Sequence, residues 1–190
     1  MIATTIHTRV WTREEYDRLV ATGIFHPDER LELVNGEIVT MSPQGSLHAT
    51  AVRLVEDTLR KVFNPGFDVR VQMPLALGPH SEPEPDVAVV VGTPRDYRSE
   101  HPQSASLVVE VADITLAYDR KTKSLLYAHA GIQEYWIVNI LDRQIEVFQH
   151  PQHTNDLTIS YHTQRIHDAT ESLSPLLRPQ AVISPTDLLP

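Results

Sequence analysis

The sequence contains no cysteine among its 190 residues. This absence excludes disulfide bonds, thiolate metal sites and cysteine nucleophiles, and it fits a reducing compartment. Long apolar runs are also missing. None approaches the roughly 20 residues of a membrane-spanning helix, and residues 1–15 lack the apolar core of a signal peptide. We therefore expect a cytoplasmic protein that has no membrane partner.

Basic residues are in the minority, with 16 lysines and arginines against 25 aspartates and glutamates and a net charge of −9. This balance argues against a broad phosphate-binding surface, which is the usual source of non-specific affinity for DNA. It leaves room for a small basic cleft, or for a site at which metal ions offset acidic side chains.

Glycine is scarce at 7 residues and proline abundant at 14, so we expect stiff loops. Hydrophobic residues make up 41% of the chain, which is enough for a proper core. The length suggests a single domain, residues 1–190, with its core at 30–150 and a C-terminal extension at 151–190.

Helix signals occur in three places. Thr12 and Glu15 have the spacing of a capping box, which predicts a short helix after Thr12. Apolar residues at helical spacing predict a second helix at 47–63, with Ser46 as its cap. A third helix is predicted at 119–130, where a glycine follows as a stop signal.

Strand signals alternate with these helices. Apolar alternation or continuous apolar runs predict strands at 68–77, 87–91, 107–111, 134–140 and 144–148, and an edge strand at 157–163. This order of elements is typical of an α/β (α+β) protein with a mixed central sheet and helices on its faces.

A hairpin is predicted near the N-terminus, because Asn35 and Gly36 separate two short alternating runs. Glu37 then follows the turn directly, and Glu32 lies on the preceding strand. On this pattern alone, both carboxylates are expected on the surface of the hairpin.

Two carboxylates stand where strands should be buried. In EPEPDVAVVVG, Asp86 precedes five apolar residues, and in LVVEVAD, Glu110 lies between two valines. A buried carboxylate without a partner costs several kcal/mol or stays protonated, and two at neighbouring strand ends repel each other. A hard cation such as Mg²⁺ (or Mn²⁺) between Asp86 and Glu110 removes both objections, since it takes one or two carboxylates and binds phosphate oxygens.

The same residues have simpler readings. Asp86 fits an ordinary strand-start residue in a proline-rich turn. Glu110 fits an edge strand with one face in solvent, and Lys123 fits an exposed helix residue.

Four segments in order carry a family resemblance: RLELVNGEIVTMSPQGSLH, EPEPDVAVVVG, SLVVEVAD and YDRKTKSLLYAHAGIQEYWIVNI. They span residues 30–140, and the chain resembles the Uma-two family within the PD-(D/E)xK nuclease superfamily. The resemblance implies a restriction-endonuclease-like fold with a mixed central sheet flanked by helices, preceded by a helix and a hairpin. It also implies a metal held by Asp86 and Glu110, DNA as the nucleic acid, and a homodimer.

The lysine departs from the simple superfamily motif, in which it follows the glutamate by two residues. That position is Ala112 here, and the Uma-two pattern places its lysine on the next helix, which corresponds to Lys123. Helical spacing puts Lys123 on the face of Tyr127, from which it reaches the Glu110 strand end, whereas Lys121 lies on a different side. By this resemblance Lys123 positions the attacking water.

The segment after Glu110 lacks the Ser-Pro-Ser-Thr-like turn of the family and keeps only Thr115. Asp113 in that turn either adds a carboxylate or caps the turn. The superfamily often takes an acid from its first elements, which makes Glu37 a candidate for a further metal contact. His48 is a candidate for contact with phosphate or water. Both also fit plain surface residues.

The leading hypothesis is a metal-dependent endonuclease that hydrolyses phosphodiester bonds, with Asp86 and Glu110 as metal ligands and Lys123 beside them. The alternative is a non-catalytic interaction or regulatory protein that retains the nuclease fold, which the altered turn favours. A carboxylate-pair glycosidase ranks last, because aromatic residues make up only 6% of the chain. The ten histidines are scattered and form no HExxH zinc motif.

Overall fold

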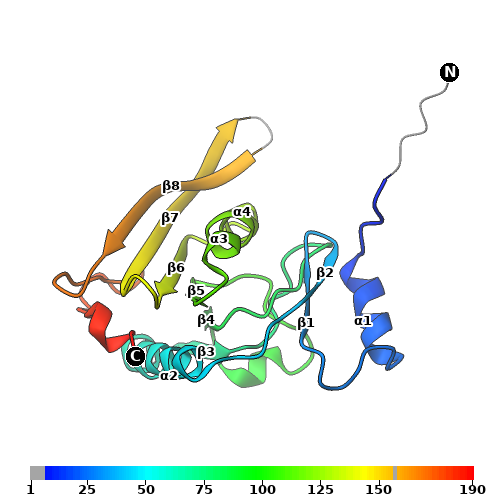
Figure 1. Ribbon diagram of the computed structural model, residues 1–190, viewed down its shortest axis with the longest axis horizontal. Coiled ribbons are helices and arrows are strands. Elements are labelled where there is room, and N and C mark those ends of the chain that lie inside the picture. The colour runs from blue at the N-terminus through cyan, green and yellow to red at the C-terminus, as the bar shows by residue number, and fades with distance from the viewer. Residues whose placement is uncertain (1–6, 156–157) are drawn as a thin grey trace.

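The computed structural model describes residues 7–155 and 158–190. Within these residues the chain forms a six-stranded mixed sheet in the order β3-β4-β5-β6-β7-β8 and a separate two-stranded hairpin, β1-β2 (Figure 1). The strands are β1 (Leu31–Val34), β2 (Glu37–Thr40), β3 (Phe67–Val71), β4 (Val87–Val91), β5 (Leu107–Ala112), β6 (Glu134–Asn139), β7 (Gln144–Asn155) and β8 (Thr158–His167). The helices are α1 (Arg13–Ala21), α2 (Ser46–Phe63), α3 (Leu116–Tyr118) and α4 (Ser124–His129), with short 3-10 turns at Pro94–Tyr97 and Pro185–Asp187.

The mixed sheet confirms the expected fold class. Strands β5 and β6 run parallel and are joined by the crossover through α3 and α4, whereas the other neighbouring strands pair antiparallel. A crossover that contains a helix is the usual connection between parallel strands. It brings α4 onto one face of the sheet, and α2 covers the other face (Figure 1).

Two helix starts test the capping predictions. The capping box is confirmed, because Thr12 accepts from the backbone of Glu15 and the Glu15 carboxylate accepts from the Thr12 N–H. The cap predicted for α2 is wrong. Ser46 is its first helical residue, and Gly45 is the N-cap without a side-chain hydrogen bond.

Two elements differ from their predicted bounds. Strand β3 ends at Val71, because Gln72 adopts a φ of 50° and leaves the ladder. The helix predicted at 119–130 is preceded by the short α3 and opens with a π-helical turn at Asp119–Lys123. Neither irregularity has a proline or glycine signal at the residue where it occurs.

The β7–β8 hairpin is longer than the two short strands predicted for it. It extends beyond the rest of the sheet, and β8 packs against α4 (Figure 1). The edge strand predicted at 157–163 corresponds to β8, although Leu157 itself lies outside the described residues. Near the C-terminus, Leu188 and Leu189 join the core beneath α2.

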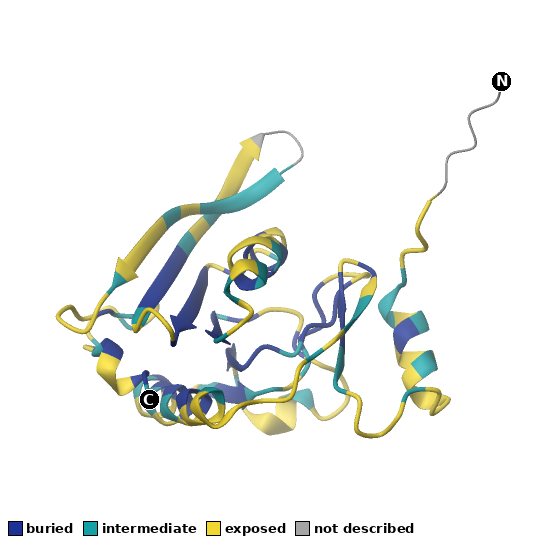
Figure 2. Cartoon of the chain, viewed as in Figure 1, coloured by how far each residue is buried: buried dark blue, intermediate teal, exposed yellow. Residues whose placement is uncertain are grey.

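Side-chain alternation along β4 and β5 decides which residues face which layer. Odd-numbered residues of both strands pack with α2, and even-numbered residues pack with α4 and β1. All six residues of β5 are buried, and the central strands form the buried interior in Figure 2. Glu110 therefore points to the α4 face, and the prediction of a buried Glu110 strand is confirmed.

The strand register brings the two acids opposite each other. Val87 of β4 pairs with Val109 of β5 in an antiparallel register. One step further along this register places Asp86 across from Glu110, on the same face. Side chains in directly opposite positions have Cβ atoms about 4.5–5.5 Å apart.

Candidate active site

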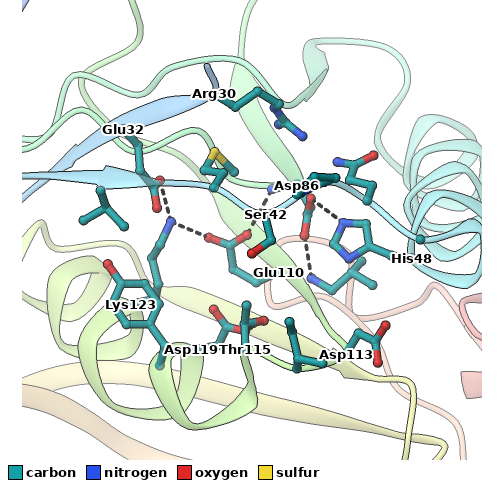
Figure 3. A pocket seen from close by; sticks show the side chains of 18 of the residues that line it. Arg30, Glu32, Ser42, His48, Asp86, Glu110, Asp113, Thr115, Asp119 and Lys123 are labelled. Carbon is teal, nitrogen blue, oxygen red and sulfur yellow. Dashed lines mark hydrogen bonds and ion pairs between the residues drawn. The ribbon is translucent and has the colours of Figure 1, made fainter. Parts of the chain in front are cut away.

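A pocket of about 310 Å³ opens on the α4 face of the sheet (Figure 3). Its walls come from the β1–β2 hairpin, the link from β2 to α2, the turn after β5, and the α3–π-helical segment. Asp86 and Glu110 belong to its lining, together with Lys123 and His48. Three stretches that are distant in the sequence, residues 30–48, Asp86 and residues 110–123, therefore meet in this pocket.

Asp86 and Glu110 are joined by crossed hydrogen bonds to each other's strand. The Asp86 N–H donates to Glu110 Oε2 at 3.1 Å, and the Val111 N–H donates to Asp86 Oδ2 at 2.9 Å. Both residues are buried, with exposed fractions of 6% and 5%. Pro85, which precedes Asp86, has no N–H, so the backbone ladder stops here and the side chains satisfy the donors beyond it.

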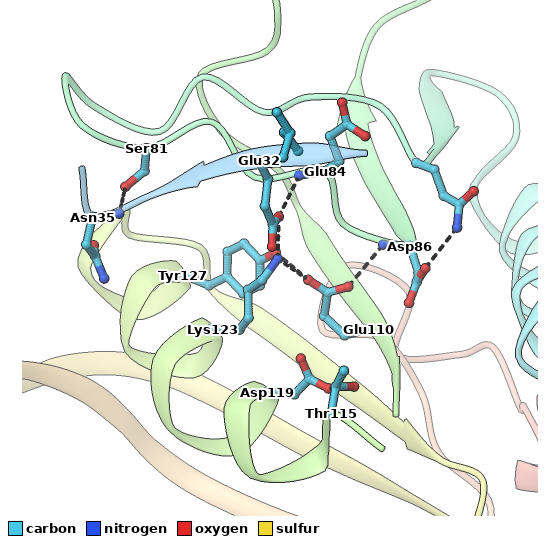
Figure 4. A network of polar contacts seen from close by, with 12 residues as sticks. Glu32, Asn35, Ser81, Glu84, Asp86, Glu110, Thr115, Asp119, Lys123 and Tyr127 are labelled. Carbon is cyan, nitrogen blue, oxygen red and sulfur yellow. Dashed lines mark hydrogen bonds and ion pairs between the residues drawn. The ribbon is translucent and has the colours of Figure 1, made fainter. Parts of the chain in front are cut away.

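Lys123 reaches the same cluster from the crossover. Its Nζ lies 2.7 Å from Glu32 Oε2 and 3.2 Å from Glu110 Oε1, and the residue is only 4% exposed (Figure 4). The Tyr127 hydroxyl, one turn further along, donates to Glu110 Oε1 at 2.6 Å. The structure thus brings together all three residues, Asp86, Glu110 and Lys123, that the sequence assigned to the site.

Glu32 was expected on the surface of the hairpin, and this prediction is wrong. The residue is 3% exposed, pairs with Lys123 and accepts a hydrogen bond from the Glu84 N–H at 3.1 Å. The signal was present in the sequence, because Glu32 lies between two leucines just as Glu110 lies between two valines. A carboxylate inside an apolar run indicates a buried polar partner in both cases.

Glu37 lies apart from the cluster. It is exposed, pairs with Val34 across the hairpin turn and does not line the pocket. The hairpin register explains this placement, because Glu37 lies at the turn, whereas Glu32 lies further from it and lines the pocket. Glu37 is therefore not part of the proposed metal site.

The other basic residues of the crossover point elsewhere. Arg120 forms a two-pronged ion pair with the fully buried Glu146, with its closer oxygen at 2.6 Å, on the side of β7. Lys121 is exposed, as the helical spacing predicted. Only Lys123 of the three lines the pocket.

Asp119 is a buried residue of the pocket whose role the sequence did not indicate. It lies in the π-helical turn with Lys123, is 4% exposed, and accepts a hydrogen bond from the Thr115 hydroxyl at 2.6 Å. Single π-helical turns are often found at functional sites. Asp113, in the turn after β5, also lines the pocket and is partly exposed.

His48 contacts the acid pair from the start of α2. Its Nε2 lies 3.0 Å from Asp86 Oδ1, which also accepts from Gln72 Nε2 at 3.1 Å. Burial alone would lower the pKa of the imidazole, but the hydrogen bond to Asp86 and the nearby carboxylates raise it. His48 is therefore a neighbour of the acid pair and not a plain surface residue.

Carboxylates outnumber cations in this pocket, and the pKa values reflect that excess. Burial raises the pKa of Glu110 to about 8, with Lys123 opposing the shift and Asp86 adding to it. Burial also raises the pKa of Asp119 to about 6, opposed by the Thr115 hydrogen bond. Burial would lower the pKa of Lys123, but Glu110 and Glu32 raise it, so the amine keeps its proton.

A pH dependence of stability follows for the metal-free protein. The folded pKa of Glu110, about 8, lies above its unfolded value of 4.5, so between these values the folded state holds more protons. Its contribution to stability is complete below pH 4.5 and is lost as the pH rises toward 8. Thermal melting in EDTA from pH 5 to 9 should show a declining melting temperature that is flatter in Glu110→Gln. Equal slopes in the two proteins would contradict the assignment.

The donor set fits a hard divalent cation held by two carboxylates. In the described part of the chain, no group of three or more His, Asp or Glu side chains is arranged to hold a metal ion. Mg²⁺, however, typically takes one or two carboxylates and completes its shell with water and substrate oxygens. Asp86 and Glu110 match this coordination preference, and a cation beside them would offset the buried negative charge.

The mixed sheet, with a parallel β5–β6 pair joined by a helical crossover and helices on both faces, agrees with the expected restriction-endonuclease-like fold. A crystal structure described as "a putative nuclease belonging to DUF820 from Anabaena variabilis ATCC 29413" has this fold, with a TM-score of 0.68 and 16% sequence identity over 90% of this chain and 95% of that chain. A comparison with protein families matches residues 13–185 to the family described as "Uma2: Putative restriction endonuclease", and the chain belongs to this family.

The search of curated proteins finds no match. Among the described residues, no helix is both long enough and apolar enough to cross a membrane. Family membership supports a nuclease function, in agreement with the resemblance seen in the sequence.

Proposed function

We propose that this protein is a Mg²⁺-dependent endonuclease that hydrolyses phosphodiester bonds in DNA. The observation that carries the proposal is the convergence of Asp86, Glu110 and Lys123 in one pocket, with the two acids hydrogen-bonded across their strands. Membership of a family described as restriction endonucleases supports the choice of reaction.

Asp86 and Glu110 are the residues that would hold the metal ion. When bound, Mg²⁺ supplies charge stabilisation for a phosphate oxygen and lowers the pKa of a bound water. Glu110 is oriented for this role by the Tyr127 hydroxyl and the Asp86 N–H, and Asp86 by His48 and the Val111 N–H.

Lys123 acts as a fixed positive charge in the proposed reaction. Its raised pKa keeps it protonated, so it donates hydrogen bonds and does not accept a proton. A protonated amine beside Glu110 can orient the attacking water and stabilise negative charge as it grows on the phosphate. Glu32 is a positioning residue, because it holds Nζ at 2.7 Å from the opposite side.

A homodimer and a cytoplasmic location are also part of the proposal. The dimer rests on the superfamily resemblance, since many nucleases of this fold pair to cut both strands. The location rests on the absence of cysteine. Size-exclusion chromatography with light scattering tests the dimer, and a single-chain mass at working concentration would remove it from the proposal.

Metal binding gives a test that does not depend on knowing the DNA target. Adding millimolar Mg²⁺ or Mn²⁺ to the EDTA-treated protein should raise its melting temperature, because an ion at 100 times its Kd stabilises by about 2.7 kcal/mol. That corresponds to roughly 5–10 °C for a domain of this size. The same titration of Asp86→Asn should give little or no shift.

Cleavage is assayed in parallel on supercoiled plasmid and oligonucleotide DNA with either metal. A melting shift with no cleavage of any DNA or RNA would contradict the proposed nuclease activity and support the proposed metal site. If neither a melting shift nor cleavage is observed, the remaining interpretation is a non-catalytic protein that retains the nuclease fold.

A further inference from the structure

The acid pair lies at the bottom of a pocket and not on an open surface. Asp86, Glu110 and Lys123 are 6%, 5% and 4% exposed, although all three line a space of about 310 Å³. Figure 3 shows the pair enclosed between the hairpin side, which carries Arg30, and the side of Asp119 and Thr115. A phosphate that reaches these acids must enter the pocket with part of its nucleotide.

Intact duplex DNA is poorly suited to such entry. Bending or kinking a duplex costs free energy, so bringing one of its phosphates into the pocket carries an energetic cost that a single strand avoids. Enzymes that need deep access to one nucleotide take it out of the stack, and the unstacking costs least when the strand is already single. The depth of the acid pair therefore favours a strand that is not held in a double helix.

The wall of the pocket offers apolar surface to a base. Met41 and Pro43 line one side, and Ile114 and Tyr118 line the other. Ile114 is 81% exposed, so its side chain is accessible to a ligand that enters the pocket. Among the described residues, the buried Tyr118 hydroxyl has no hydrogen-bond partner, so a polar group of a ligand or a water can satisfy it.

Arg30 provides a cation for one phosphate at the rim. It lines the pocket, and among the described residues its charge acts on the partly buried Glu84, whose pKa it lowers against the effect of burial. Lys123, by contrast, is already paired with two carboxylates. One arginine beside the acids, on a chain of net charge −9, suits recognition of one phosphate better than a long backbone track.

From these observations we infer that the pocket binds one unstacked nucleotide of a single-stranded DNA segment. The base packs against Met41, Pro43 and Ile114, and its phosphate lies between Arg30 and the acid pair. This inference rests on the proposed nuclease function and adds the substrate form: single strands, frayed ends or bubbles in preference to intact duplex. Proteins that hold single strands usually combine apolar contact with the bases, most often from aromatic side chains, with a local positive charge.

The test compares one oligonucleotide sequence in three forms: single strand, blunt duplex, and duplex with a central bubble. With Mg²⁺, kcat/KM for the single strand and the bubble should exceed that for the duplex by about tenfold or more. Equal or faster cleavage of the duplex would overturn the inference and leave the nuclease activity intact.

Binding is measured separately, so that the inference is decided even if no DNA is cut. Fluorescence anisotropy with the cleavage-deficient Asp86→Asn should show tighter binding of the single strand than of the duplex. Equal binding of both forms, or no binding of the single strand, would overturn the inference. Absence of cleavage with a preference for the single strand would instead count against the proposed function.

Two variants test the contacts. Ile114→Ser should raise KM for the single strand about fivefold with little change in kcat, since base packing contributes binding. Arg30→Gln should raise KM and reduce the salt dependence by about one ion. The matched controls, Leu141→Ser and Arg18→Gln, alter an exposed leucine and an exposed arginine outside the pocket and should leave KM unchanged. If a test variant has the same KM as its control, the contact proposed for the substituted residue is wrong.

Discussion

Asp86→Asn is expected to lower kcat/KM for DNA by about 10³-fold or more at saturating Mg²⁺. A metal-stabilised phosphate gains several kcal/mol in the transition state, and each 1.36 kcal/mol corresponds to a factor of ten in rate. The amide keeps the size of the carboxylate and one oxygen for the Val111 N–H, so the fold should survive. Single-turnover cleavage of a labelled oligonucleotide measures the rate.

Glu37→Gln is the matched control for this loss. It removes one carboxylate from the same protein, but at an exposed position outside the pocket. Its rate should equal that of the parent. If Glu37→Gln lost activity as severely as Asp86→Asn, the placement of the metal site would be wrong.

Lys123→Met is expected to cause the largest loss of stability. Removing the amine leaves Glu32 and Glu110 buried without their cation, and breaking a buried pair costs about 3–5 kcal/mol. For a domain of this size that corresponds to a fall in melting temperature of about 6–20 °C. The loss should be smaller at pH 5 than at pH 8, because protonation of Glu110 removes one of the uncompensated charges. Differential scanning calorimetry of the EDTA-treated protein measures both.

Lys121→Met, two residues earlier in the same turn, is the control. Lys121 is exposed, and surface substitutions usually change stability by less than about 0.5 kcal/mol. Similar melting temperatures for the two variants would mean that Lys123 is not the counter-charge of Glu110 in solution.

The strands of the sheet and the register of the hairpin could be predicted from local patterns. Continuous valine runs indicated β4 and β5, and the Asn35-Gly36 turn set the register of the hairpin. The convergence of Asp86 and Glu110 followed from their positions at the ends of these runs. Such features depend on the spacing of apolar residues and on the residue types at a turn, and both are properties of neighbouring residues in the sequence.

The remaining parts of the site depend on contacts between distant segments. Glu32 is buried because Lys123, 91 residues away, supplies its partner. Asp119 is buried because the crossover packs onto β5 and β6 and widens into a π-helical turn. Strand β3 stops early because Gln72 turns back to bond the carbonyls of Pro85 and Asp86. The leucines beside Glu32 indicate a buried carboxylate, but no local pattern identifies its partner, the burial of Asp119 or the early end of β3.

The crossed hydrogen bonds between Asp86 and β5 give the two acids a structural role that is independent of catalysis. They close the pairing of two central strands at the point where a proline interrupts the backbone ladder. An amide oxygen at either position would accept the same N–H, so folding alone requires an acceptor there and not a negative charge. A pair of buried carboxylates in place of two amides is therefore a cost to folding that a cation-binding role would account for.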